Sequence, residues 1–439
     1  MLLRQFVDED LGCGSYLLVD EQTRAAAVVD PAYEIEPYLE QAERDGATLV
    51  CVIETHTHAD HVSGHGRLAL EHGLPVHVHP EAHPDYPFAP ITDGQDLAIG
   101  AATIRVLHTP GHRPEHCCLV TGDAVLTGDS LFVGSVARPD LAVEAREGAE
   151  GLFHSLQRLL ELPDAFRVYP GHVAGSLCGS GMSGDPSSTI GTERRLNPAL
   201  ALSLVEEFID SSAAVSTPRP PTMTRVVALN RGPFLGAQAP LAARSDAGGA
   251  IVLDVRPPRE FVGGHIPGAI NVPVSGSAFG TKTGFILDPG ERIVIHAASA
   301  DEAERAARRL HAAGILELDG YLESVDADET IEPVSFEELD RLLGEGVVVL
   351  DVREHDERSQ GFISGTRHVP YRLLRACSAT LPRDRPVVTL CESGARAAIG
   401  ASVLKRFGID ARPVLDGGIA DWESEGGSLV EMRRCGQSP

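Results

Sequence analysis

The sequence predicts a multidomain protein of mixed α/β and α+β class. Three observations support this prediction. Short apolar strands broken by glycine, proline and aspartate fill residues 1–235, with helical spacing only in short stretches. From about residue 240, one strand–turn–helix pattern occurs twice in succession. The length of 439 residues corresponds to about three domains at roughly 150 residues each.

The first 235 residues are expected to form one domain of buried strands and a few helices. Short apolar runs bounded by Gly, Pro or Asp are typical of strands in a sheet core. We expect strands at residues 25–30, 48–55, 74–79 and 102–109. Apolar residues at helical spacing predict helices at residues 152–162 and 197–209.

The rest of the chain contains an internal repeat. The segment IVLDVRPPREF (251–261) matches VVLDVREHDER (348–358), and a further strand and helix follow each copy in the same order. Each copy alternates strand, turn and helix, which predicts a small α/β domain with a mostly parallel sheet. We place the domains at residues 1–235, 236–328 and 329–439, with the acidic segment 323–335 as the linker between the two copies.

The composition argues against several classes of partner. Positive side chains number 37 and negative ones 63, and the resulting net charge of −26 disfavours nucleic acid or an anionic membrane surface. No apolar run reaches the roughly 20 residues that span a bilayer, and the N-terminus has no basic segment followed by an apolar one. Eight cysteines are too few for a disulfide scaffold. We therefore expect free thiols in a cytoplasmic protein, and we also expect a homo-oligomer.

The motif HTHADH at residues 56–61 follows a buried strand pattern and carries the side chains of a metal site. Alternate residues of an extended chain point the same way, so His56 and His58 can face one point. Asp60 and His61 open the next turn and can face an adjacent point. Three further candidates follow strand patterns next to Gly or Pro, namely His112, Asp129 and His172. This set predicts a metal cluster rather than scattered polar loop residues.

Other residues near these motifs are assigned structural positions. His116 follows His112 by about one helical turn. We expect it to contact the metal ligands at most, and not to bind the metal itself. Cys117 and Cys118 belong to the strand-like segment CCLV, and Cys13 belongs to GCGSYLL. We expect these three cysteines to be structural.

A second candidate site is the loop CESGAR, from Cys391 to Arg396, which follows the apolar strand PVVTL and opens the helix AAIGASVLKRF. Such a turn wraps backbone N–H groups around the sulfur, and the helix N-terminus adds positive potential. Both favour the thiolate, which is the nucleophilic form. The residues between these two are Glu392, Ser393, Gly394 and Ala395. Arg396 can steady the loop or pair with an anionic acceptor.

The first copy of the repeat lacks these reactive side chains. Ala297 stands at the position of Cys391, and Glu302 stands at the position of Arg396. This copy therefore has no thiol at this turn, and we expect it to have kept the fold as a spacer or docking element.

With these motifs, residues 1 to about 235 resemble the metallo-β-lactamase fold, an αβ/βα sandwich with metals at one edge. Within that superfamily, TGDSLFVGSVARPDL (127–141) and VYPGHVAGS…TIGTERRLNP (168–198) resemble the persulfide dioxygenase branch. The second half resembles two rhodanese domains, a degenerate one followed by an active one. The whole chain is similar to persulfide dioxygenase–rhodanese fusions.

The resemblance implies a single Fe(II) ion per chain, bound by His56, His112 and Asp129. Two imidazoles and one carboxylate are the ligand set of many non-haem iron oxygenases. Four other residues would hydrogen-bond around the iron, or would complete two zinc sites as in hydrolases of the superfamily: His58, Asp60, His61 and His172. Both possibilities stay open at this point.

The implied reaction is the oxidation of a low-molecular-weight thiol persulfide by dioxygen to sulfite and free thiol. Cys391 would move sulfane sulfur through a cysteine persulfide and interconvert sulfite and thiosulfate. Arg138 matches the position that helps hold the carboxylate end of the substrate. Cys178, in a Gly/Ser-rich segment, either guides sulfur near the metal or is an inert thiol. Ala174 stands where a glutathione-dependent relative has tyrosine, which leaves the carrier thiol open.

Two alternatives remain. The first is a dizinc thioester hydrolase similar to glyoxalase II, fused to a sulfurtransferase and holding two zinc ions. The second treats the rhodanese pair as a sulfur-sensing or partner-docking module.

Overall fold

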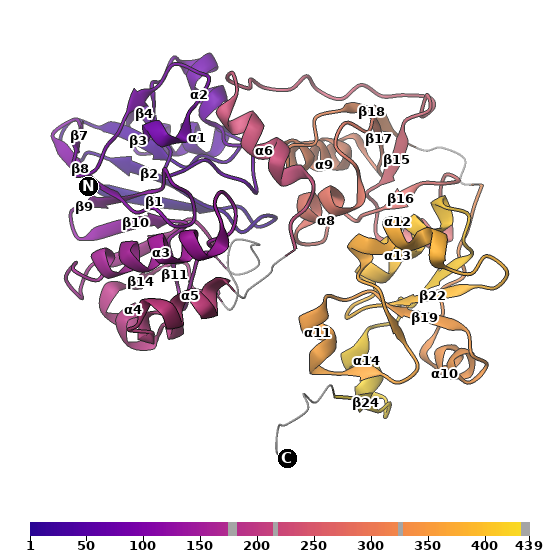
Figure 1. The fold of residues 1–439 in the computed structure, drawn as a ribbon. Coiled ribbons are helices and arrows are strands. Elements are labelled where there is room, and N and C mark those ends of the chain that lie inside the picture. Colours follow the sequence, from indigo (N-terminus) through magenta and orange to yellow (C-terminus); the bar gives the residue numbers. More distant parts are fainter. Residues whose placement is uncertain (174–181, 214–217, 324–327, 432–439) are drawn as a thin grey trace. The chain divides into compact units, whose positions relative to one another are not determined.

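The computed structural model describes residues 1–173, 182–213, 218–323 and 328–431. The chain forms two compact units: residues 1–238 together with 311–315, and residues 239–310 together with 316–439. The mixed α/β and α+β class predicted from the sequence is confirmed (Figure 1).

The first unit contains two six-stranded sheets that face each other. One sheet has the order β1 (Leu2–Val7), β2 (Gly14–Val19), β3 (Ala25–Val29), β4 (Thr48–Ile53), β5 (Val76–Val78), β6 (Ala89–Pro90). The other has the order β14 (Ser188–Thr189), β13 (Arg167–Pro170), β10 (Ala124–Gly128), β9 (Cys117–Thr121), β8 (Ala102–His108), β7 (Asp96–Ile99). Alternate strand residues such as Leu18, Ile53 and Leu119 meet between the sheets and form the core.

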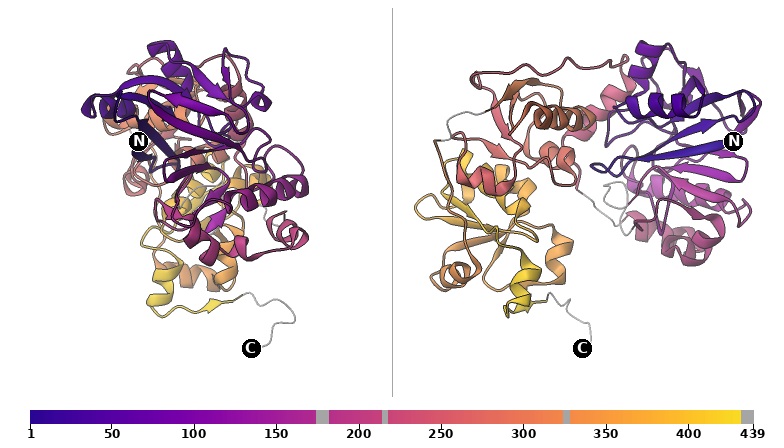
Figure 2. Two further views of the ribbon diagram at one scale, coloured as in Figure 1. Left: turned by 90° about the vertical axis from the view of Figure 1, so that its left-hand side faces the viewer. Right: turned by 180° about the vertical axis from the view of Figure 1, so that it is seen from behind.

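Helices cover both outer faces of this pair of sheets, which gives the αβ/βα layering (Figure 2). The elements outside the sheets are α1 (Glu36–Arg44), α2 (His65–His72), η1 (Pro80–Ala82), the hairpin β11 (Leu131–Phe132) and β12 (Ser135–Val136), α3 (Ala145–Leu159), α4 (Ile190–Leu196), η2 (Pro198–Ala201), α5 (Val205–Ala213) and α6 (Thr222–Arg231). Ile35, Tyr38 and Leu68 pack α1 and α2 against the first sheet, whereas Leu152 and Leu156 pack α3 against the second.

The prediction of one helix over residues 197–209 is wrong for the first half of that segment. Asn197 is extended, with φ −75° and ψ 116°, and its side chain accepts a hydrogen bond from the N–H of Ala199. Asn and Pro favour caps over helix interiors, so Asn197 ends α4 and a short 3₁₀ turn follows it. The regular helix begins only at Val205.

The second unit contains two parallel four-stranded sheets of the same strand order, which confirms the internal repeat. The first has the order β16 (Ile270–Asn271), β15 (Ile251–Asp254), β17 (Ile293–His296), β18 (Leu318–Leu322), and the second β21 (Arg367–His368), β19 (Val348–Asp351), β22 (Val387–Leu390), β23 (Ala411–Pro413). The helices of this region are α7 (Pro258–Gly263), α8 (Phe279–Ile286), α9 (Ala300–Ala312), α10 (Phe336–Gly344), α11 (His355–Gln360), η3 (Tyr371–Leu373), α12 (Leu374–Cys377), η4 (Ser378–Thr380), α13 (Ala395–Arg406) and α14 (Ile419–Ser424). A small pair is formed by β20 (Phe362–Ile363) and β24 (Leu429–Val430).

Parallel pairing determines where the polar motifs lie. Strands β3 and β4 run parallel, so Asp30 and the HTHADH motif leave the first sheet at the same edge. Strands β10 and β13 also run parallel, so Asp129 and His172 leave the second sheet together. Among the described helices, none combines the length and apolar character needed to cross a bilayer.

Candidate functional site

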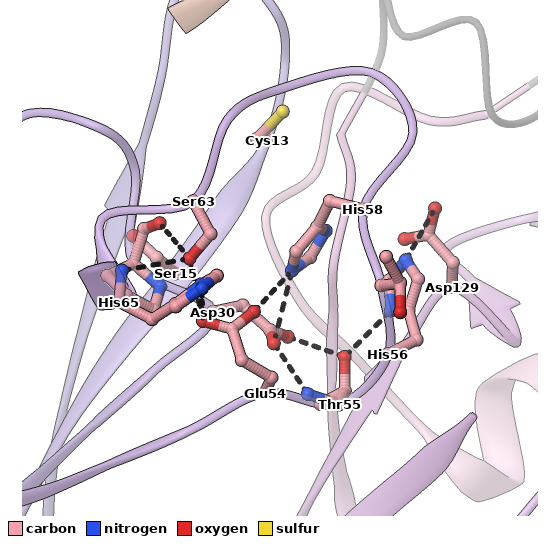
Figure 3. Close-up of polar contacts among 12 residues, drawn as sticks. Cys13, Ser15, Asp30, Glu54, Thr55, His56, His58, Ser63, His65 and Asp129 are labelled. Atoms are coloured by element: carbon pink, nitrogen blue, oxygen red, sulfur yellow. Dashed lines mark hydrogen bonds and ion pairs between the residues drawn. The ribbon is translucent and has the colours of Figure 1, made fainter. Parts of the chain in front are cut away.

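The first candidate site begins where β4 ends. Asp30, just beyond β3, accepts hydrogen bonds from the N–H and the hydroxyl of Thr55, each at 2.7 Å. The Thr55 hydroxyl in turn lies 2.9 Å from Nδ1 of His56. This contact fixes the ring of His56, whose Nε2 lies 3.8 Å from Oδ2 of Asp129 (Figure 3).

His112 approaches the same carboxylate from the loop after β8. Its Nδ1 lies 3.0 Å from the carbonyl oxygen of Arg138, and its Nε2 lies 3.5 Å from Oδ2 of Asp129. Gly111 has φ +150°, and a Cβ at this position would lie 2.4 Å from the backbone of Leu152. The glycine therefore allows α3 to pack closely under the loop that presents His112.

The three side chains form a group suited to one cation. One ligand atom from each of His56, His112 and Asp129 lies within 4.8 Å of the others, and all three residues are buried. Oδ2 of Asp129 is buried without a hydrogen-bond partner among the described residues, a costly arrangement that a cation would relieve. Burial, and next the neighbouring imidazoles, lower the pKa of His56, and burial also lowers that of His112, so both present neutral nitrogens. The residues present therefore fit a metal ion.

His58 is directed elsewhere. Its Nε2 lies 3.2 Å from Oε2 of Glu54 and 3.3 Å from Oδ1 of Asp30, so the ring is held between two buried carboxylates (Figure 3). Burial opposes protonation, but these two carboxylates outweigh it and raise the pKa of His58 well above its usual value. Ser63 also donates a 2.6 Å hydrogen bond to Glu54.

His172 is bound through both ring nitrogens. Nδ1 lies 2.7 Å from Oδ1 of Asp129, and Nε2 lies 2.7 Å from Oδ2 of Asp60. His61 also approaches Asp60, with Nδ1 at 3.4 Å from Oδ1. The structure thus brings Asp60, His61 and His172 together beside Asp129, where a second metal position would lie in a dizinc hydrolase.

Cys13 lies among these residues. Its Sγ is 3.2 Å from Oδ2 of Asp60 and 3.4 Å from both Nδ1 of His61 and Nε2 of His172. Burial, and next the charge of Asp60, raise the pKa of the Cys13 thiol well above its usual value, so it stays protonated. The sequence-based assignment of Cys13 to a purely structural position is therefore too narrow, because the thiol contacts three candidate site residues.

Asn230, near the end of α6, is a second residue that sequence reasoning missed. Its amide nitrogen donates to the carbonyl oxygens of His58 and His61, at 3.0 and 2.8 Å, and its amide oxygen accepts from the N–H of Ser63 at 2.9 Å. Asn230 therefore holds the backbone of the HTHADH turn in place.

Several other predicted residues can be placed. Arg138 is buried and pairs with Asp140, with Nε 2.6 Å from Oδ1. His116 lies 2.9 Å from the hydroxyl of Thr109, as a supporting residue would. Cys117 and Cys118 are buried in the sheet core as predicted. Cys178 and Ala174 lie outside the described residues.

The second candidate site lies between β22 and α13. Cys391 is 1% exposed, and its Sγ accepts a 3.3 Å hydrogen bond from the N–H of Ala397 in the first turn of α13. Gly394 has φ +81°, which lets the loop between Cys391 and α13 turn back over the sulfur. Gly418 approaches so closely that a Cβ there would lie 1.7 Å from the carbonyl oxygen of Glu392. One backbone N–H, that of Ala397, thus donates to the sulfur at the turn where the sequence predicts a backbone cradle.

Arg396 already has an anionic partner. Its two terminal nitrogens lie 2.5 and 2.6 Å from the two carboxylate oxygens of Glu357. Nη1 of Arg353 lies 3.1 Å from Oε2 of Glu392. Both arginines are therefore already paired with a carboxylate. The expected pairing of Arg396 with an anionic acceptor must therefore compete with a bidentate ion pair.

In the first copy of the repeat, the corresponding residue is inert. Ala297 directly follows β17, just as Cys391 directly follows β22, and each residue is 1% exposed. The carboxylate of Glu302 accepts a hydrogen bond from the N–H of Ala298 at 2.8 Å. The fold is kept without a thiol at this turn.

Comparisons with known proteins agree with these two parts. The metallo-beta-lactamase superfamily matches residues 9–172, and the rhodanese-like domain matches residues 237–327 and 335–425. The chain is similar to the mitochondrial persulfide dioxygenase ETHE1 of Homo sapiens, with 31% identity over 258 residues, which cover 55% of this chain and 91% of that protein. It is also similar to the hydroxyacylglutathione hydrolase of Alkalilimnicola ehrlichii, with 35% identity over 160 residues, which cover 36% of this chain and 60% of that protein.

A solved structure extends the similarity beyond the first unit. The metallo-beta-lactamase of Staphylococcus aureus subsp. aureus COL aligns with a TM-score of 0.68 and 27% identity, covering 74% of this chain and 98% of that one. Fold and site thus define a metallo-beta-lactamase superfamily member that carries two rhodanese-like domains. Within that superfamily, the chain belongs with the homologues of the ETHE1 persulfide dioxygenases, as the sequence motifs predict.

Proposed function

We propose that the chain is an iron-dependent persulfide dioxygenase coupled to a sulfurtransferase. The observation that carries the first part is the group of His56, His112 and Asp129, from which His58 is drawn away by Asp30 and Glu54. Similarity to persulfide dioxygenases over most of their length supports the same reaction. The net reaction converts a persulfide, dioxygen and water into a thiol, sulfite and two protons.

The three residues would hold one ferrous ion, which would supply the redox chemistry that couples dioxygen to the persulfide. The other residues of the protein orient the side chains that would hold the ion. Thr55 positions His56, and the carbonyl of Arg138 positions His112. His172 can hold a proton between Asp129 and Asp60, directly beside the reacting groups.

The second part of the proposal concerns Cys391. Its thiolate would attack the sulfane sulfur of thiosulfate, the S–S bond would break, and sulfite would leave. An acceptor thiolate would then attack the outer sulfur of the Cys391 persulfide, forming a new persulfide and restoring the Cys391 thiolate. The backbone cradle at Ala397 would stabilise the anionic sulfur in both states.

A direct test measures dioxygen consumption and sulfite formation with synthetic glutathione persulfide. We expect both in equal amounts, and we expect His112→Ala to lose iron and dioxygen consumption together. The matched control is His154→Ala, because His154 is exposed on α3. Full iron content in His112→Ala would contradict the proposed ligand set.

One observation favours a second candidate function, a dizinc thioester hydrolase. Asp60, His61 and His172 gather beside Asp129 as a second metal position requires. Hydrolysis of a glutathione thioester by protein that holds two zinc ions, without dioxygen consumption, would establish this alternative. For the rhodanese pair, absence of turnover with thiosulfate and cyanide would support a sensing or docking role instead.

A further inference from the structure

Residues 311–315 lie in the first compact unit, although in the sequence they belong to the first copy of the repeat, which has no thiol at its active-site turn. The residues on either side of them, 239–310 and those from 316 onward, belong to the second unit. All five residues of the segment are buried. The contacts that bury them are therefore made with the domain that carries the candidate metal site.

One of these contacts is a hydrogen bond to the end of the HTHADH turn. The N–H of Val62, the residue after His61, donates to the carbonyl oxygen of Ala312 at 2.7 Å. The carbonyl oxygen of His61 belongs to the same peptide group as this N–H, and it accepts a 2.8 Å hydrogen bond from the side chain of Asn230. Because a peptide group is planar, two bonds on its opposite sides fix its orientation. The chain therefore leaves the turn in one direction only.

Apolar packing supports the same contact. Ala312 belongs to a buried cluster that also contains Tyr33, Val62 and Val226. The ring of His311 lies edge-on to the ring of Tyr33, with centroids 6.0 Å apart. Burial lowers the pKa of His311 to about 4, so this ring is neutral at pH 7. The segment is thus held by side chains as well as by its backbone.

Gly314 allows the segment to approach α6 closely. Its φ is +77°, and a Cβ at this position would lie 2.8 Å from Cγ2 of Val226. The next nearest atom, Cδ1 of Leu229, is 3.7 Å away. Glycine is therefore favoured here both by the backbone conformation and by the contact with a single methyl group.

We propose that the copy of the repeat without a thiol is a positioning element of the metal-binding domain. Through residues 311–315 it holds the end of the HTHADH turn, and so the side chains that this turn presents. Such a role needs no cysteine, in agreement with alanine at position 297. The role depends neither on which metal ion is bound nor on which reaction follows, so it goes beyond the proposed function.

Hydrogen exchange at the amide of Val62, measured in the metal-free full-length protein, tests this role. The amide of Leu119, in the middle of β9 and fully buried, reports global unfolding. Gly314→Ala should raise the ratio of the Val62 rate to the Leu119 rate at least about fivefold, because the new methyl group displaces the segment locally.

Gly290→Ala is the matched control. Gly290 lies in the same copy of the repeat and has φ +87°, but a Cβ there would meet no atom of the described residues within 4 Å. The control therefore carries a similar backbone cost without the contact, and its ratio should equal that of the unaltered protein.

A second substitution separates positioning from general damage. Val226→Ala removes the atom that the new methyl group would meet, so Gly314→Ala/Val226→Ala should recover slow exchange at Val62. In metal-loaded protein, Gly314→Ala should release its ion to EDTA about three- to tenfold faster than the unaltered protein. Gly290→Ala and the double variant should release the ion at the unaltered rate.

Three results would overturn the proposal: an unchanged ratio in Gly314→Ala, an equal rise in Gly314→Ala and Gly290→Ala, or no recovery in the double variant. If Gly314→Ala does not fold, His311→Ala carries the test, because it removes the ring contact with Tyr33 and should raise the ratio about threefold. An unchanged ratio in that variant would likewise overturn the proposal. None of these measurements needs turnover, so their outcome is independent of the proposed dioxygenase reaction.

Discussion

The thiol of Cys13 lies 3.2 Å from the carboxylate of Asp60, although 47 residues separate the two in the chain. An isolated bridge between the backbones of Cys13 and His172 holds the thiol there. The Cys13 thiol therefore belongs to the hydrogen-bonded group that includes Asp60 and His172, in the place where a second metal would bind.

Replacing Cys13 tests this contact. Cys13→Ala removes a buried donor to Asp60 and should lower the free energy of unfolding by about 1–2 kcal/mol. Cys13→Ser keeps a hydrogen-bond donor, so its free energy of unfolding, measured by urea denaturation, should lie closer to that of the unaltered protein. Equal stability of all three proteins would show that the thiol contributes nothing to this group.

The buried ring of His116 predicts a pH dependence of stability. Burial, and next the charge of His112, lower the pKa of His116 to about 3, whereas the unfolded chain has a histidine pKa near 6.5. Between these values the unfolded state binds one more proton, so the free energy of unfolding falls as the pH falls, by about 1.4 kcal/mol per pH unit. His116→Gln should remove this contribution in metal-free protein, and urea denaturation at pH 7 and pH 5 measures the difference. An unchanged pH slope would contradict the neutral, buried state of His116.

The ion pair between Glu357 and Arg396 predicts a change in acceptor preference. Glu357→Gln frees the guanidinium close to Cys391, which should raise kcat/KM for the anionic acceptor sulfite about three- to tenfold. The gain should shrink at high salt, since it is electrostatic. Glu345→Gln, at an exposed residue of the same domain, is the control. A loss of activity with sulfite would mean that Glu357 instead holds Arg396 in its working position.

The two proposed activities should be separable. Cys391→Ser is expected to abolish sulfur transfer from thiosulfate and to leave dioxygen consumption with added glutathione persulfide unchanged. Ser cannot form a persulfide, and Cys391 lies in a different compact unit from His56, His112 and Asp129. Loss of both activities in this variant would show that the sites do not work independently.

The sequence predicts the fold class and the internal repeat correctly, because these depend on local patterns. The candidate ligands remain predictions, and the structure brings the side chains of His56, His112 and Asp129 together. His56 and Asp129 follow β4 and β10, each of which pairs in parallel with a neighbouring strand, whereas His112 follows β8, whose two neighbours are antiparallel. Family resemblance then gives the ligand roles, which stay predictions until metal is measured.

Residues that act through distant contacts could not be predicted in the same way. Asn230 binds the backbone of His58 across 172 positions, and Cys13 contacts His172 across 159 positions. Neither belongs to a recognisable motif, because the contact depends on tertiary packing alone. The ion pair that occupies Arg396 depends in the same way on Glu357, which is 39 positions away.

The central claim is that one iron ion is held by His56, His112 and Asp129. Anomalous diffraction from crystals of the purified holoprotein, recorded at the iron and zinc absorption edges, tests it most directly. We predict a single iron peak between Nε2 of His56, Nε2 of His112 and the carboxylate of Asp129. Two zinc peaks, one on each side of Asp129 and the second contacting Asp60 and His172, would contradict the account.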